Sequence, residues 1–180
     1  INGSAMGGGC EVALACDVRI ATAGDFAIGQ PEIMLGFAPG GGATQRLTRM
    51  LGTRLALRVV LEGRPYSPAE ALELGIVDQI VDVTALMTTA VGEASRLGSR
   101  PKSAIGAAKR AVYEAASESL TDGLRSEAAE FLSALGSQEA QAAMAAYVAA
   151  TEHSGDLPAY DPAQVDRALA AGRFVPGPLA

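Results

Sequence analysis

The sequence predicts a mixed α/β fold, with a glycine-rich first half that combines short strands with helices and an alanine-rich second half made of helices. Two observations predict this division. Short apolar runs bounded by turn residues, which are typical of buried strands, lie before residue 82. From Thr84 onward the apolar residues recur at helical spacing. We therefore expect a core over residues 1–83, a helical region over 84–153, and an extension over 154–180 with a short helix and a loose tail.

Glycine and proline bound the predicted elements of the first half. Their order is a helix at residues 11–16, strands at 18–21 and 26–29, helices at 43–51 and 55–61, a further helix, and a strand at 76–81. That further helix has the clearest start. Ser67 is its expected N-cap, Pro68 lies in the first turn and Glu70 holds the capping-box position, while Gly75 ends it.

The predicted helices of the second half are separated by residues that break helices. These are Pro101, Gly136 and the pair Ser154 and Gly155. The predicted helices span residues 84–97, 102–116, 120–135, 138–151 and 162–171. Because alanine-rich helices pack closely, this half is expected to act as an interaction module as well as a cover for a site.

The composition is that of an ordinary globular domain. The chain has 180 residues, of which 49% are hydrophobic and 19% charged, so one domain can bury a real core. Its net charge is −6 and no basic stripe alternates with aromatic residues, which argues against nucleic-acid binding. No apolar run has the length of a membrane helix, and the first residues do not resemble a signal peptide.

Two cysteines, Cys10 and Cys16, lie in one short apolar segment. We expect reduced, buried thiols and a cytoplasmic, reducing location. A disulfide and a metal pair are the disfavoured alternatives, the second because the chain has a single histidine.

Two glutamates lie in glycine-flanked frames. Glu11 follows Gly7, Gly8 and Gly9, and Glu32 precedes a second glycine-rich loop that contains Gly40. A glycine run that ends in an acid places bare backbone N–H groups beside a carboxylate. Such a pair can polarise a carbonyl and move a proton next to it, and two carboxylates can divide acid and base work.

These frames resemble the crotonase superfamily, the enoyl-CoA hydratases and isomerases. The resemblance covers residues 1 to about 81, at Ile1-Asn2-Gly3, Gly7-Gly8-Gly9-Cys10-Glu11, Ala15-Cys16-Asp17, Gly29-Gln30-Pro31-Glu32, Gly36, Pro39-Gly40, Thr44-Gln45-Arg46-Leu47, and the stretch from Ser67 to Asp78. It implies a crotonase-like ββα spiral core, followed by a C-terminal helical trimerisation region. Because Ile1 falls where family members have just finished a core strand, the resemblance also implies that an N-terminal portion is missing. That portion carries further strands, one of two oxyanion-hole donors and much of the groove for the nucleotide.

The resemblance assigns catalytic roles to three residues. The N–H of Gly8 is expected to bind the thioester oxygen, Glu11 to activate a water molecule, and Glu32 to protonate the α-carbon. Because two carboxylates in a small dry site cannot both ionise cheaply, one is expected to stay protonated. The division between the two acids could be shared or reversed. The alternatives are a tight turn at Gly8 and two solvated acids.

Further residues are expected to shape the substrate site. Gly7 and Gly9 let a ligand approach the backbone, and Gly40 begins a helix whose dipole would polarise the thioester. Phe131 matches an aromatic near the acyl-CoA groove, with a core aromatic as the equal alternative. The basic cluster at the end of many hydratases has no counterpart here, so phosphate binding would fall to Arg46, Arg49, Lys102, Lys109 or the missing portion.

The resemblance implies an enoyl-CoA hydratase that adds water to a trans-2-enoyl-CoA, since isomerases of the superfamily commonly lose the first acid. No metal or redox cofactor is expected, because coenzyme A arrives as part of the substrate. The expected assembly is a homotrimer or homohexamer. The alternatives are another crotonase reaction (isomerisation, thioester hydrolysis or dehalogenation) and a non-catalytic scaffold, and inactivity of the isolated chain also stays open.

Overall fold

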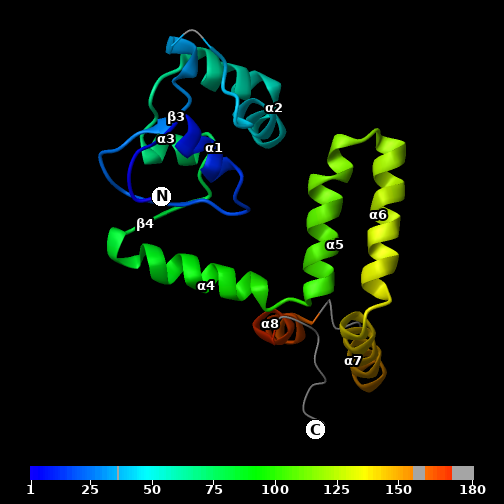
Figure 1. Ribbon diagram of the computed structural model, residues 1–180. Helices are drawn as coiled ribbons and strands as arrows, with labels where there is room; N and C mark the ends of the chain where they lie inside the picture. The colour runs from blue at the N-terminus through cyan, green and yellow to red at the C-terminus, as the bar shows by residue number, and fades with distance from the viewer. Residues whose placement is uncertain (36, 156–160, 172–180) are drawn as a thin grey trace. The chain divides into compact units, whose positions relative to one another are not determined.

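The computed structural model describes residues 1–35, 37–155 and 161–171 (Figure 1). The chain forms two compact units, Ile1–Val91 and Gly92–Ala180. The first unit combines strands and helices, and the described part of the second is helical. The predicted α/β class is therefore confirmed. The division at residues 83 and 153 stays a prediction, because the boundary between the units falls inside a helix, α4 (Leu86–Gly98).

Two short parallel strand pairs organise the first unit. β1 (Ala5–Met6) pairs with β3 (Ile28–Gly29), and β2 (Ile20–Thr22) pairs with β4 (Gln79–Val81). Parallel strands cannot be joined by a tight hairpin, so helices and longer segments connect them. The pairing of β1 with β3 matters for function because β1 leads into the first glycine run and β3 leads into Gln30.

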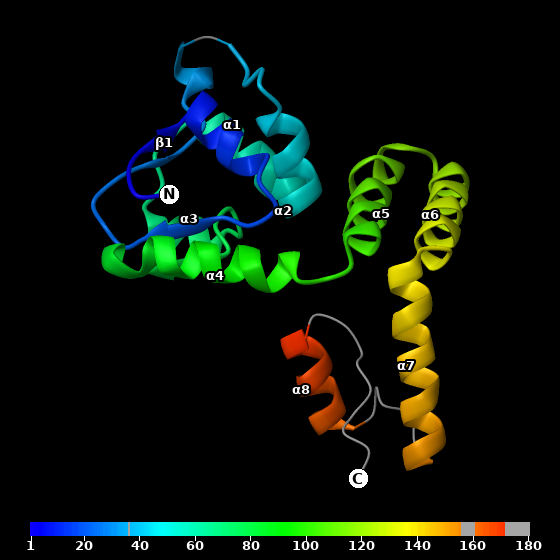
Figure 2. The ribbon, with the colours of Figure 1, turned by 60° about the horizontal axis from the view of Figure 1, so that its bottom comes forward.

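The helices of the first unit follow the predicted order. They are α1 (Gly8–Leu14), the 3₁₀ helix η1 (Glu32–Leu35), α2 (Ala43–Glu62), α3 (Pro68–Glu73) and the 3₁₀ helix η2 (Val83–Ala85), which runs into α4. α1 packs against α2 (Figure 2). Gly52 interrupts α2 with φ 75° and ψ 160°, which confirms the predicted break between two helical segments.

The start of α3 is built as predicted. The Ser67 hydroxyl accepts a hydrogen bond from the Glu70 N–H, and the Glu70 carboxylate accepts one from the Ser67 N–H. Pro68 occupies the first turn, where its missing N–H costs nothing. This capping box fixes the entry to the helix by local contacts alone.

The core of the first unit is formed by side chains of β1, β2, β3, α1, α2, α3 and the segments that connect them. Its most deeply buried large members are Ile28, Leu47, Val59, Tyr66, Ile76 and Val77. The core also includes Cys10 and Leu14 of α1, so burial anchors the helix that carries the first acid.

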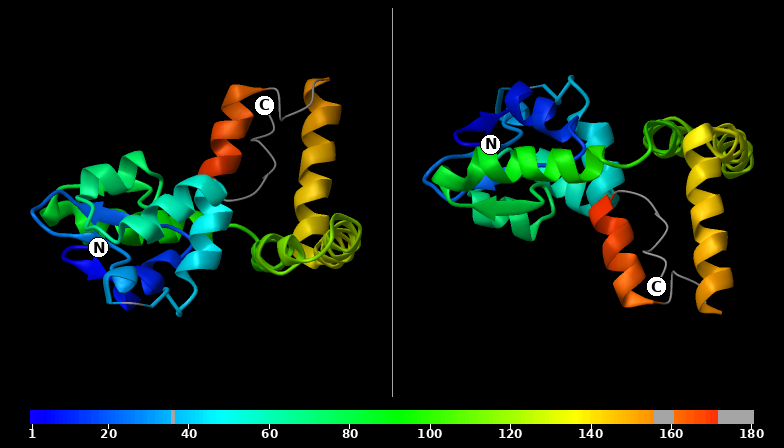
Figure 3. Two further views of the ribbon diagram at one scale, coloured as in Figure 1. Left: turned by 90° about the horizontal axis from the view of Figure 1, so that it is seen from above. Right: turned by 90° about the horizontal axis from the view of Figure 1, so that it is seen from below.

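The second unit consists of the last part of α4 and helices that match the predicted set. These are α5 (Lys102–Tyr113), the 3₁₀ helix η3 (Ala115–Ser117), α6 (Leu120–Leu135), α7 (Gln138–Ser154) and α8 (Pro162–Ala171). α5 and α6 lie side by side and are joined by the ion pair of Arg110 with Glu130, at 2.6 Å. α7 extends from the end of α6 at a steep angle to it (Figure 3). Large apolar side chains such as Val112, Leu132 and Val148 are exposed on these helices.

The prediction that both thiols are buried is confirmed for Cys10 and wrong for Cys16. Both cysteines are free, but Cys10 is buried and Cys16 is exposed. The reason is the length of α1, which ends at Leu14 and leaves Cys16 beyond its packed face.

Candidate active site

Glu11 lies in the first helix of the chain, and its side chain is buried with 8% exposure. The N-cap of the helix is Gly7, whose carbonyl accepts a hydrogen bond from the Glu11 N–H at 3.0 Å. Gly7 has φ 55° and ψ −123°, a backbone conformation that a residue with a Cβ rarely adopts. The glycine run therefore turns the chain sharply from β1 into α1 and directs Glu11 inward.

The carboxylate of Glu11 binds the N-terminus of another helix. Its Oε1 accepts hydrogen bonds from the Gly41 N–H at 2.7 Å and from the Ala43 N–H at 3.1 Å. Gly42, the N-cap of α2, has no side chain to cap the helix, so Glu11 supplies the negative charge that the helix dipole favours. A Cβ at Gly41 would lie 2.8 Å from the Glu11 Cδ, so this approach requires glycine.

Glu32 lies at the start of η1 and is also buried, with 8% exposure. The Met34 N–H donates to the Pro31 carbonyl at 2.9 Å and closes a 3₁₀ turn that the sequence did not predict. Gln30 is fully buried. With its amide nitrogen toward the acid, Gln30 Nε2 lies 3.1 Å from both carboxylate oxygens of Glu32. The Gln30 amide can thus donate to both oxygens of Glu32 and fix the orientation of that carboxylate.

Each acid packs against a glycine that lies near the other acid in the sequence. A Cβ at Gly7 would lie 3.0 Å from the Glu32 Oε1, so the second acid rests against the glycine that starts the helix of the first. In the same way, Glu11 rests against Gly41 in the loop that follows the second acid. Each carboxylate therefore occupies space that a glycine of the other acid's frame leaves open.

The thiol of Cys10 lies beside both acids. Burial raises the pKa of Cys10, and the negative charges of Glu32 and Glu11 raise it further. The thiol therefore stays neutral and behaves as a small apolar group in the wall of the site.

The remaining glycines leave room for a ligand. Gly8, Gly9 and Gly40 are exposed, and a Cβ at any of the three would meet nothing within 4 Å. Gly8 is the first residue of α1, where the helix offers its N–H no acceptor, and none of the described residues accepts from it. This N–H is therefore available to an anionic oxygen.

A comparison with known proteins identifies the family. The sequence matches the enoyl-CoA hydratase/isomerase family over residues 1–154. The chain belongs to this family. A probable enoyl-CoA hydratase of Mycobacterium bovis is 42% identical over 148 residues, which are 82% of this chain and 57% of that protein. A short-chain-enoyl-CoA hydratase of Clostridium acetobutylicum is 34% identical over 82% of this chain and 56% of its own length.

The fold agrees with this family assignment. The crystal structure of an enoyl-CoA hydratase from Bacillus anthracis aligns with a TM-score of 0.75 and 33% sequence identity, over 82% of this chain and 57% of that one. The crotonase fold expected from the sequence is therefore confirmed for the part that the chain contains. The chain spans somewhat more than half the length of the curated relatives that it matches.

Two residues lie against the predicted acids although the sequence did not assign them there. The sequence predicts no contact of Gly41 or Gln30 with an acid, whereas Gly41 donates to Glu11 and the Gln30 amide lies beside Glu32. A buried glutamine next to an acid has no signature in a single sequence. Phe131 lies on α6 of the second unit and is 62% exposed in the single chain. Its place near an acyl group stays a prediction.

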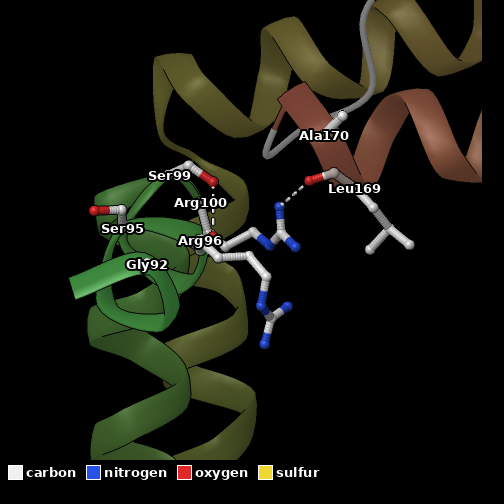
Figure 4. A pocket seen from close by; sticks show the side chains of 7 residues that line it. All are labelled: Gly92, Ser95, Arg96, Ser99, Arg100, Leu169 and Ala170. Carbon is white, nitrogen blue, oxygen red and sulfur yellow. Dashed lines mark hydrogen bonds between the residues drawn. The ribbon is translucent and has the colours of Figure 1, made fainter. Parts of the chain in front are cut away.

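A cavity of about 590 Å³ lies in the second unit, at the end of α4 (Figure 4). It is lined by Gly92, Ser95, Arg96, Ser99, Arg100, Leu169 and Ala170. Its arginines already have partners, because Arg100 donates to the Leu169 carbonyl at 2.9 Å and Arg96 pairs with Glu93. None of the predicted catalytic residues lines it.

Within residues 1–35, 37–155 and 161–171, no group of three or more histidine, cysteine or acidic residues is arranged to hold a metal ion. In the same ranges no helix is long and apolar enough to cross a membrane.

Proposed function

We propose that this chain carries the acid–base site of an enoyl-CoA hydratase, which adds water reversibly to a trans-2-enoyl-CoA to give a 3-hydroxyacyl-CoA. The observation that carries the proposal is the pair of buried carboxylates, Glu11 and Glu32, each resting against a glycine of the other's frame. The relatives named as hydratases support it. The proposed reaction needs no metal or redox cofactor, since coenzyme A enters as part of the substrate.

The Gly8 N–H is the proposed donor to the thioester oxygen. When water adds to the β-carbon, the electrons of the double bond move toward that oxygen and form an enolate. A fixed N–H at that point is worth about 3 kcal/mol in the transition state. The N–H of Gly8 lies at the positive end of α1 and has no described acceptor, which suits this role.

Glu11 is the proposed base. Its Oε1 is occupied by two backbone N–H groups, and among the described residues only this oxygen of the carboxylate carries hydrogen bonds. Oε2 is therefore the oxygen that can accept a proton from water. As that proton moves to Glu11, the water oxygen bonds to the β-carbon.

Glu32 is the proposed acid, which donates its proton to the α-carbon as the enolate collapses. The Gln30 amide beside both of its oxygens holds it in place. Return of one proton from Glu11 to Glu32 restores the starting state, so the net change is the addition of one water molecule. This division of roles between the two acids could still be exchanged.

The test is hydration of crotonyl-CoA, followed as the loss of enoyl-thioester absorbance in the protein as the cell produces it. A Glu11→Gln variant keeps the oxygen that accepts from Gly41 and Ala43 but loses the basic carboxylate. The expected fall in kcat is about 10²–10⁴-fold, the usual value of acid–base catalysis. A rate within about threefold of the wild type would refute the role.

Assembly is a second proposal, favoured by the exposed apolar side chains of α5, α6 and α7. Large exposed apolar surfaces usually mark contacts with other chains, so we infer a homotrimer or homohexamer. Sizing of the protein tests it, and calorimetry with crotonyl-CoA separates an enzyme from a scaffold. An oligomer that ignores acyl-CoA would favour the scaffold. The free thiols of Cys10 and Cys16 suit the proposed cytoplasmic location.

A further inference from the structure

We propose that Arg46 is a positioning residue that holds Glu11 in its catalytic place by clamping the turn of Gly41 and Gly42. The proposal rests on the proposed function of Glu11. Arg46 lies in the first turn of α2, and its Nη1 donates to the Gly41 carbonyl at 3.0 Å. A Cβ at Gly42 would lie 3.1 Å from the Arg46 Cζ, so the guanidinium folds back over the turn.

The clamp acts on the peptide that lies between the two donors to Glu11. The Oε1 of Glu11 accepts from the N–H of Gly41 and from the N–H of Ala43, on either side of Gly42. The peptide group that joins Gly41 to Gly42 includes the carbonyl that Arg46 binds. If that peptide rotates, the two N–H groups no longer converge on one oxygen. The geometry at Glu11 therefore depends on this peptide staying fixed.

The turn needs a restraint from another side chain, because glycine restricts its own backbone dihedral angles only weakly. Gly42 has φ 108°, and two consecutive glycines can adopt many backbone conformations. Of the described side chains, that of Arg46 is the one that binds the Gly41 carbonyl. A buried carboxylate displaced by about 1 Å can lose roughly 10² in rate, so a modest restraint has a large catalytic effect.

The charge of Arg46 does not explain its position. A cation in the first turn of a helix opposes the helix dipole. Among the described residues Arg46 forms no ion pair, and its side-chain bond goes to backbone. A single guanidinium can reach the carbonyl of Gly41 and cover Gly42 together, which a shorter side chain cannot do.

Arg49 provides a matched control on the same helix. Its guanidinium donates to Gln45, to the carbonyl and to the side-chain oxygen, both at 3.1 Å, and does not touch the glycine turn. The Arg46→Met and Arg49→Met variants therefore remove the same group from neighbouring turns of α2, but only the first removes the clamp.

The experiment measures amide hydrogen exchange at Gly41 and Ala43 together with the kinetics of crotonyl-CoA hydration. In Arg46→Met, exchange at both amides should speed up about tenfold, and kcat should fall about tenfold with KM within about twofold. Arg49→Met should leave the exchange rates of both amides at their wild-type values, because its guanidinium binds Gln45 and not the turn. If Arg46→Met does not fold, Arg46→Gln, which keeps a shorter donor, is measured instead and should show a smaller change in the same direction.

Three results would overturn the clamp. They are unchanged exchange at the two amides, an unchanged kcat, or a rise in KM alone, which would make Arg46 a phosphate contact of the substrate. The exchange measurement needs no activity. If the wild type fails to hydrate crotonyl-CoA while the amides of Arg46→Met exchange faster, then the proposed function fails and the clamp on the turn stands as a structural contact.

Discussion

Replacing Gly41 with alanine tests the central contact of the site. The added Cβ would lie 2.8 Å from the Glu11 Cδ, about 0.6 Å inside ordinary contact at 3.4 Å, and 3.2 Å from Oε1. The side chain of Glu11 is buried and held by two backbone N–H groups, so it cannot move away without breaking at least one of them. A hydrogen bond to a charged group contributes about 1.5–3 kcal/mol. A displacement of this size at a reacting group costs about 10²-fold in rate.

The expected result for Gly41→Ala is therefore a fall of about 10²-fold in kcat/KM for crotonyl-CoA, with a lower melting temperature. Gly3→Ala is the matched control, because a Cβ there would meet nothing within 4 Å. Absorbance kinetics and thermal unfolding measure the two effects. If Gly41→Ala retains kcat/KM within about threefold of the wild type, the site does not depend on this contact and the reasoning is wrong.

Three other predictions test neighbouring features. Gly7→Ala combines a strained φ of 55° with a methyl group pressed against the acid of η1, so it should lower the unfolding free energy by about 1–3 kcal/mol in urea titrations; no change would contradict the strain. Exposed Cys16 should react with iodoacetamide at least about tenfold faster than Cys10, whose burial raises its pKa, and peptide mass spectrometry that finds equal rates would refute the buried site. Hydrogen bonds, first from Arg58, lower the pKa of Glu62 from 4.5 to about 2. The stability that this group contributes is thus present above pH 4.5 and lost as the pH falls toward 2, so Glu62→Gln should flatten acid unfolding in that window; an unchanged curve would show that solvent screens the contact.

Elements that depend on local chemistry could be predicted from the sequence. The capping box at Ser67 and the break at Gly52 follow from the properties of neighbouring residues, and the structure has both. The long helices of the second half were likewise visible from their spacing, and α6 begins and ends where the pattern predicts. The ends of α1 and the exposure of Cys16 were not visible, because a helix only two turns long has little periodicity.

The contacts of the site are long-range, and that is why the sequence could name the acids but not their partners. The chain separates Glu11 from the Gly41 N–H by thirty residues, and no local pattern connects them. The strand β1 was missed for the same reason, since its two residues are a strand only because β3 lies beside them. The 3₁₀ helix that begins at Glu32 was not predicted, because a single 3₁₀ turn leaves no repeat to detect.

The carboxylate that caps α2 ties folding to chemistry in one side chain. A related protein in which Glu11 is replaced would lose the proposed base. It would also leave the N–H groups of Gly41 and Ala43 without their acceptor. Its evolution toward another reaction would therefore require a compensating change at the same helix, and such paired substitutions should be found together among diverged relatives rather than singly.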